Sequence, residues 1–369
     1  MAEELGSQAA GLLIDEAWNA HRAGRYEQAV AAASRAAQAA GPLDDPVLLV
    51  RALRVEGEAL RQMGDPAAAL ARYTRILGLA EDRGTSGRLD DGRAAEAVAV
   101  AHWNWVACAR FLTGIPVREL FAVLDAGERW LAATGHRDWR AALLLQRAIV
   151  HERLGEQEAA VGAAEEALAV ALQHPDAPGY TLGSFRYQLG TLLRAAGQAA
   201  EAVPHYQAIL ADAASGLWDR NAAHEGLAWC HLEANDLVAA RREATAAVRL
   251  AESLGDDALC TSLDVLADAC RAAGDLDAAG QAAARHLEAA GRVGGHDRPY
   301  FAVRTAVDIA LDRADLGTAR DLLTELDRHA APLDAAAGNT VMADEVARRH
   351  ERLAELTAAS SPPNVGGRD

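Results

Sequence analysis

The sequence predicts an all-α fold, a solenoid of about eight helical hairpins followed by a C-terminal capping helix. Three observations predict this class. Alanine, leucine, glutamate and arginine, all strong helix formers, dominate the 369 residues. No stretch combines β-branched and aromatic residues with the two-residue alternation of a half-buried strand. Turn-forming residues recur about every 40 residues, which is the spacing of stacked two-helix units.

Each hairpin is marked by residues that end one helix and begin the next, as in the stretch "GDPAAALARY". Gly64 can adopt the left-handed conformation that closes a helix. Asp65 can cap the following helix by accepting a hydrogen bond from a free amide, and Pro66 suits the first helical position because that amide is unpaired anyway. The same pattern predicts turns near residues 24, 64, 114, 155, 197, 235, 274 and 314.

The second helix of each hairpin carries a stripe of buried residues at positions i, i+4 and i+7, which share one helix face. A small residue at the start of the stripe lets the two helices approach, and larger residues then fill the space. The stripe is formed by Ala69, Tyr73 and Ile76 in one unit and by Ala202, Tyr206 and Ile209 in another.

The first helices contain glycines in their interiors. Gly57 and Gly190 each lie seven residues before the glycine of the turn. A glycine inside a helix costs about 1 kcal/mol relative to alanine, so we expect a close packing contact at both positions.

These features together resemble the tetratricopeptide repeat family. The matching residues are Gly57, Gly64, Ala69 and Tyr73 in one unit, Gly190, Gly197, Ala202 and Tyr206 in another, and Gly24, Tyr26 and Ala29 in the first. The resemblance covers about residues 10 to 330. It implies a right-handed superhelix whose first helices line a concave groove.

The sequence departs from the family pattern in three ways. The period exceeds the usual value of about 34 residues, the terminal proline of the motif is missing, and Glu119 replaces the small alanine in the third unit. These departures favour the long-helix variants, which resemble the solenoids of large bacterial transcription activators, kinesin light chains and quorum-sensing peptide receptors. HEAT-like hairpins are the alternative from the period alone, but they do not explain the glycines.

The predicted domain organisation has three parts. Residues 1–330 form the solenoid, with flexible loops at 82–97, 173–183 and 291–300. Residues 331–359 form the capping helix that a solenoid needs at its end, and residues 360–369 form a disordered tail.

Composition limits the partners and the compartment. The net charge of −17 argues against nucleic acid and against anionic membranes as partners, because both need a basic surface. The acidic N-terminus does not resemble a secretory signal, and no apolar run reaches the length of a membrane span. The four cysteines form no C-x-x-C pair and lie in apolar helical stretches, as expected for buried thiols in a reducing cytoplasm.

No motif points to catalysis, a cofactor or a metal. His224 and His231 lie in "HEGLAWCH", which is not the H-E-x-x-H zinc motif because Ala228 stands where the second histidine is needed. Packed, hydrogen-bonded histidines are the favoured interpretation. We therefore predict a binding protein rather than an enzyme, although an enzyme that uses the solenoid interior as a pocket stays open as an alternative.

Candidate groove residues are those on the stripe of each first helix that lies opposite its packing face. These are Arg51, Arg54, Glu58, Arg61, Asn104, Gln146, Arg153, Tyr187, Gln188, Arg194, Glu225, Trp229, Asp264, Asp268 and Arg271. The alternative is that these charges have no binding function and are solvated or paired with neighbours, such as Arg54 with Glu58.

Three arginines, Arg51, Arg54 and Arg61, lie close to one face and predict an anion site, because guanidinium binds carboxylate in paired hydrogen bonds. Amides and hydroxyls further along could bind a peptide backbone, and the C-terminal end of the groove would be acidic. We therefore predict a scaffold or adaptor for a peptide or protein segment with an anionic group. Homo-oligomerisation stays open. So does a peptide- or small-molecule-sensing regulator, which would act on another protein because the repeats begin too early to leave room for a helix-turn-helix domain.

Overall fold

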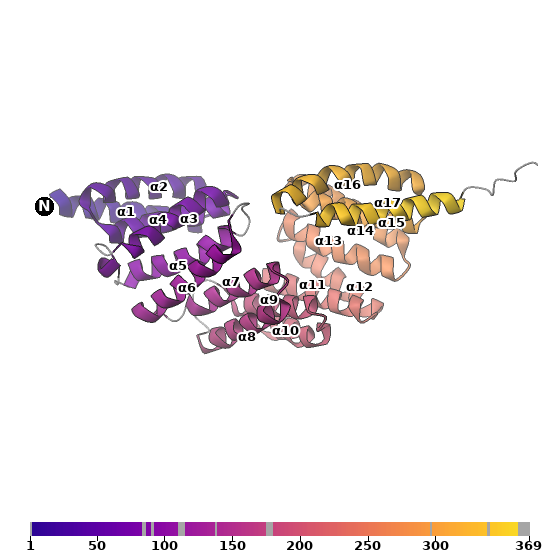
Figure 1. Ribbon diagram of the computed structural model, residues 1–369, viewed down its shortest axis with the longest axis horizontal. Coiled ribbons are helices and arrows are strands. Elements are labelled where there is room, and N and C mark those ends of the chain that lie inside the picture. The colour runs from indigo at the N-terminus through magenta and orange to yellow at the C-terminus, as the bar shows by residue number, and fades with distance from the viewer. Residues whose placement is uncertain are drawn as a thin grey trace, which may run out of the picture. The chain divides into compact units, whose positions relative to one another are not determined.

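The regular structure of this chain is helical throughout. The computed structural model describes residues 2–82, 86–89, 92–109, 115–136, 139–174, 180–295, 297–337 and 340–360. Across these ranges the chain forms seventeen α-helices and two short 3-10 helices, with no strand (Figure 1). The predicted all-α class is confirmed, and helices α1 to α16 pair into eight hairpins with α17 after them.

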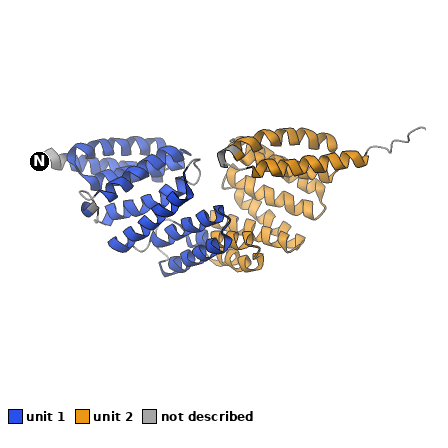
Figure 2. Cartoon of the chain, viewed as in Figure 1, with its two compact units in different colours: residues 1–185 blue, residues 186–369 orange. Residues whose placement is uncertain are grey.

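The first compact unit spans residues 1–185 (Figure 2). It contains four hairpins, in which consecutive helices pack against one another. Their bounds are α1 (Ala2–Arg22) and α2 (Tyr26–Ala40), α3 (Pro46–Gln62) and α4 (Pro66–Glu81), α5 (Gly92–Ala109) and α6 (Val117–Thr134), and α7 (Arg140–Arg153) and α8 (Gln157–Gln173). The 3-10 helices are η1 (Gly41–Leu43) and η2 (Ser86–Arg88).

The second unit spans residues 186–369 and begins inside α9. Its helices are α9 (Leu182–Ala195) and α10 (Ala199–Ala211), α11 (Leu217–Glu233) and α12 (Leu237–Ala251), α13 (Asp256–Ala272) and α14 (Leu276–Val293), α15 (Asp297–Asp312) and α16 (Leu316–Ala337), and α17 (Val341–Ser360). Helix α17 packs against α16 and α15, the place expected of a cap.

Helix boundaries differ from the predicted loops in detail. Helix α5 begins at Gly92, so part of the predicted loop at 82–97 is helical, and helices α14 and α15 take up most of 291–300. Helix α16 continues through Pro332 to Ala337 before the last helix begins. Apart from Ser360, the predicted tail lies outside the described residues, and the division into domains stays a prediction.

The turn residues adopt the conformation that their chemistry favours. Glycines at 24, 64, 155, 197 and 274 have φ between 71° and 78°, while Asn235 and Ala314 take up φ of 57° and 55° in the same role. The turn predicted near residue 114 lies outside the described residues. Because alanine is strained in this region, the turn at Ala314 is the one, among the predicted turns that the structure describes, where the residue type does not suit the backbone.

The cap at Asp65 has a measurable consequence. Its carboxylate accepts a hydrogen bond from the amide of Ala68 at 2.9 Å, at the start of α4. We expect Asp65→Ala to lower the free energy of unfolding by about 1 kcal/mol, because one amide loses its partner. Asp65→Asn should leave it unchanged, since asparagine caps equally well. Urea unfolding followed by circular dichroism checks this; equal stability of the two variants would contradict it.

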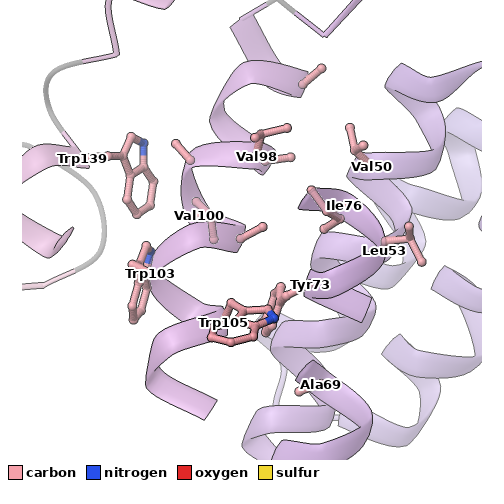
Figure 3. Close-up of a cluster of buried hydrophobic side chains, with 14 of the residues drawn as sticks. Val50, Leu53, Ala69, Tyr73, Ile76, Val98, Val100, Trp103, Trp105 and Trp139 are labelled. Carbon is pink, nitrogen blue, oxygen red and sulfur yellow. The ribbon is translucent and has the colours of Figure 1, made fainter. Parts of the chain in front are cut away.

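The interior glycines of the first helices make room for tyrosine rings. A Cβ atom at Gly57 would lie 2.8 Å from the ring of Tyr73, and one at Gly190 would lie 2.7 Å from the ring of Tyr206. Both tyrosines are completely buried. Tyr73 packs with Ala69 and Ile76 in the core of the first unit, as Figure 3 shows. The predicted packing role of these glycines is confirmed.

Two further predictions concern the state of the cysteines and the presence of membrane-spanning helices. All four cysteines are buried free thiols. None of the helices in the described ranges has both the length and the apolar character that crossing a bilayer requires.

Candidate functional site

A cavity of about 370 Å³ lies in the first unit between first helices of successive hairpins. Helices α1, α3 and α5 provide its lining: Asp15, Trp18, Arg22, Arg51, Arg54, Arg93 and Glu96. Four arginines thus face two carboxylates, in a chain whose net charge is −17. The cavity wall is therefore locally basic.

Arg54 is the fixed member of this group. Its side chain is 17% exposed and pairs with Glu58 and Glu96, each at 3.0 Å. The guanidinium also lies 5.3 Å from the ring centre of Trp18 and 6.0 Å from that of Trp139. Burial alone would lower the pKa of Arg54, but the two glutamates outweigh it and the pKa is raised. The pairing of Arg54 with Glu58 means that this arginine is already neutralised.

The positive charge at this cavity that is not ion-paired comes from Arg22, Arg51 and Arg93. None of the three forms an ion pair within the described parts of the chain, although Arg22 donates a hydrogen bond to Asn19 Oδ1. Arg61, the third arginine expected here, is not part of the lining, and its buried Nε atom has no hydrogen-bond partner in the part of the chain that the structure describes. The predicted trio is thus only partly brought together, and Arg22 and Arg93 join it instead.

Two amides of the first unit are buried and incompletely hydrogen-bonded. Asn104 is 1% exposed, and neither its Nδ2 nor its Oδ1 atom has a partner among the described residues. Gln146 is fully buried; its Nε2 donates to the hydroxyl of Tyr180 at 2.8 Å, while its Oε1 has no partner. Each buried polar atom without a partner costs about 1–3 kcal/mol, so these amides lower the stability of the folded protein when no ligand is bound.

Two tryptophans of the first unit also have a buried polar atom that lacks a hydrogen-bond partner among the described residues. Among the described residues the buried Nε1 atoms of Trp103 and Trp139 have no hydrogen-bond partner, and Figure 3 shows both rings on the same side of the core cluster. The ring of Trp103 packs on Tyr180 at 5.2 Å, which joins it to Gln146. Trp139 lies beside Arg54, which lines the cavity.

The candidates of the second unit are mostly paired with one another or with neighbours. Arg194 pairs with Glu233 at 2.7 Å and lies over the ring of Trp229. Asp264 pairs with Arg304, Asp268 with Arg271, and Arg271 also with Asp312. Glu225 is buried and accepts a hydrogen bond from Ser262. The carboxylates at this end are therefore not free to hold a cation.

The remaining three candidates are scattered. Tyr187 is half-buried and its ring lies 6.1 Å from that of Tyr206. Gln188 is half-buried, and Arg153 is exposed at the end of α7.

No protein-family model matches the sequence, and no curated protein sequence matches it. Solved structures are similar across nearly the whole chain. RapI in its apo form has a TM-score of 0.64 at 10% identity, covering 95% of this chain and 99% of its own. A Rap protein complexed with Competence and Sporulation Factor has a TM-score of 0.54 at 14% identity, with the same coverage. The apo quorum sensor NprR from B. thuringiensis has a TM-score of 0.55 at 13% identity, covering 94% and 97%.

These likenesses and the repeated hairpins decide the fold. It is a tetratricopeptide-like helical repeat. Identities of this size establish the fold alone, so the site of this tetratricopeptide-like protein is argued from its own residues.

The histidine pair of "HEGLAWCH" has a structural role in this tetratricopeptide-like fold. His224 Nδ1 lies 2.7 Å from Glu243, and His231 Nδ1 lies 3.9 Å from Asp236. Within the described ranges no group of three His, Cys, Asp or Glu side chains could hold a metal ion.

Sequence reasoning missed several cavity residues for identifiable reasons. Arg93 falls in the loop predicted at 82–97, but in the structure it lies in the first turn of α5. In the second unit Arg298, Phe301 and Arg304 lie on α15, which contains none of the predicted groove residues. The one available signal was the 40-residue spacing itself, which aligns Arg304 with the candidate Asp264.

Proposed function

We propose that this protein is a peptide-binding adaptor or regulator, which holds an extended segment with an anionic group on the inner side of its first unit. The observation that carries this proposal is the pair of buried amides: both polar atoms of Asn104 and the Oε1 atom of Gln146 lack a hydrogen-bond partner among the described residues. They lie in the same unit as a basic cavity, and Arg54 of that cavity lies 6.0 Å from the ring centre of Trp139.

An extended peptide supplies what these groups lack. Its backbone presents a donor and an acceptor at each residue, and a primary amide such as that of Asn104 can pair with both at once. Arg51 and Arg93 have their guanidinium donors available for a carboxylate of the same segment. Apolar side chains of the peptide would contact the rings of Trp18, Trp103 and Trp139, which combine apolar faces with N–H donors.

The structural likenesses support a regulatory version of this function. NprR is a quorum sensor, and the Rap protein is complexed with Competence and Sporulation Factor. By analogy, peptide binding here would control the interaction with a second protein. The proposal includes a cytoplasmic location, which four cysteines without a disulfide bond favour.

The test selects peptides from a display library of random peptides with free C-terminal carboxylates, using the full chain. Dissociation constants are then measured by fluorescence anisotropy. We expect Asn104→Leu to weaken binding by about tenfold or more, because the peptide backbone loses two hydrogen bonds. The same variant should be as stable as the parent protein or more stable, because leucine has a similar shape and no unpaired polar atoms. A purely structural amide would instead lose stability.

Arg51→Glu tests the anion site. It should weaken binding of peptides with a carboxylate by about tenfold or more, and peptides amidated at that group should lose most of this difference. Arg118→Glu is the matched control, since Arg118 is exposed on α6 of the same unit and does not line the cavity. Arg54 is avoided because its replacement would leave Glu58 and Glu96 without a partner. Failure to select any peptide, or equal binding by both arginine variants, would refute the proposal.

A further inference from the structure

A second cavity lies wholly within the second unit and differs in chemistry from the first. It has a volume of about 300 Å³, the space of about ten water molecules, which suits a ligand with a single ring. Helices α9, α11, α13, α14 and α15 provide its lining. Three arginines, two aromatic rings and one histidine dominate this lining: Arg194, Arg298, Arg304, Trp229, Phe301 and His286.

The arginines provide charged hydrogen-bond donors at the cavity wall. Each has one carboxylate partner, and the pairs are Arg194–Glu233 at 2.7 Å, Arg298–Asp257 at 2.7 Å and Arg304–Asp264 at 3.1 Å. Of these three carboxylates only Asp264 belongs to the lining. A guanidinium carries five N–H donors, so one carboxylate partner does not use them all. The cavity therefore offers charged donors to a small anion.

His286 adds a buried polar atom that has no partner. The residue is 1% exposed, and its Nδ1 atom makes no hydrogen bond within the described chain. The nearest carboxylate oxygen, on Asp264, is 3.8 Å away, which exceeds hydrogen-bonding distance. Burial, reinforced by Arg304 and Arg298, lowers the pKa of His286 to about 4. The ring is therefore neutral near pH 7 and can serve one hydrogen bond at the cavity wall.

The two aromatic rings make one part of the cavity suited to a flat apolar group. Arg194 lies 5.6 Å from the ring centre of Trp229, and Arg304 lies 5.1 Å from that of Phe301. An aromatic ligand can stack on or against such rings while its acidic group meets the arginines.

We propose that this cavity binds a small carboxylate that carries an aromatic ring. The arginines provide charge-assisted hydrogen bonds, the rings provide the apolar contact, and His286 Nδ1 gains the partner that it lacks. This site is separate from the peptide site proposed in the first unit. The same chemistry could be supplied by a free aromatic acid or by the C-terminal aromatic residue of a peptide.

The experiment uses isothermal titration calorimetry on the full chain with phenylacetate and with N-acetylphenylalanine as probes. We expect at least one of them to bind, and the one that binds more tightly identifies the source of the ligand. Acetate lacks the ring and 2-phenylethanol lacks the charge, so both should bind about tenfold more weakly or worse. Binding of acetate as tight as that of the aromatic acids would overturn the aromatic part of the proposal.

The variants locate the site. Arg298→Gln should weaken binding of the tighter probe by about tenfold or more, while Arg285→Gln, an exposed arginine of α14 outside the cavity, should leave it unchanged. Should Arg298→Gln fold poorly, Trp229→Leu provides a second test with the same expected direction. Failure of both probes to bind at millimolar concentration, or equal binding by the cavity variants and Arg285→Gln, would overturn the site. Arg51→Glu in the first unit should not affect these probes, so failure here is distinguishable from failure of the peptide proposal.

Discussion

Replacing Gly226 by alanine is expected to lower the free energy of unfolding by about 3 kcal/mol, near the upper end of the usual cost of overpacking a core. A Cβ atom at Gly226 would lie 2.3 Å from the ring of Tyr206, far inside any normal contact. The ring cannot move away, because Gly190 approaches it as well, with a Cβ position 2.7 Å from the ring. Tyr206 is completely buried between helices, so relief requires the helices to separate.

Gly291→Ala is the matched control for this prediction. Gly291 lies inside α14 of the same unit, and beyond its chain neighbours and its own helix backbone no atom of the described residues lies within 4 Å of its Cβ position. Alanine there should leave the stability unchanged or raise it by up to about 1 kcal/mol, because only helix propensity changes. Urea unfolding followed by circular dichroism measures both variants. Equal stability of Gly226→Ala and Gly291→Ala would contradict the close packing of the Tyr206 ring against Gly226.

The glycines illustrate why the fold could be predicted from the sequence. A turn glycine such as Gly64 is required by its backbone conformation, and an interior glycine such as Gly57 by the ring of Tyr73. Both requirements are local to one hairpin, so they recur at the period of the repeat. Gly226 was not recognised as a packing glycine, because it accommodates Tyr206 of the preceding hairpin and lies outside the pattern within a hairpin.

The candidate sites were predicted less completely, for a related physical reason. Helical spacing shows which residues share a face. Of the residues predicted for one groove, Arg51 and Arg54 line one cavity in the structure, and Arg194, Trp229 and Asp264 line another. Helical spacing does not show which charges find partners on other helices. The pairing of Arg54 with Glu96, 42 residues away, depends on how successive hairpins stack.

The second large effect that we expect concerns Glu225. The contribution of this residue to the free energy of unfolding depends on pH. This residue is 6% exposed, and burial raises its pKa to about 7. The hydrogen bond from Ser262 at 2.5 Å and the charge of Arg298 act in the opposite direction but do not overcome burial. In the unfolded chain the carboxyl has its ordinary pKa of 4.5.

The sign of the pH effect follows from proton binding. Between pH 4.5 and about 7 the folded protein keeps a proton on Glu225 that the unfolded chain has lost, so stability falls as the pH rises through this window. The full loss, reached above about pH 7, is about 3 kcal/mol. Glu225→Gln keeps an acceptor for Ser262 and carries no charge at any pH. It should therefore be more stable than the parent protein by about 3 kcal/mol near pH 8 and by little near pH 4.5.

Measuring this variant against the parent protein isolates Glu225 from the other buried titratable groups. The pKa values of His102 and His286 are lowered to about 4 by burial, so both histidines destabilise the fold as the pH falls below 6.5. Their effect is common to both proteins and cancels in the difference. Urea unfolding at about pH 5 and about pH 8 provides that difference, with Glu252→Gln, an exposed glutamate of the same unit, as the control. A stability difference independent of pH would mean that Glu225 is solvated in the folded protein, because only burial keeps its proton bound at neutral pH.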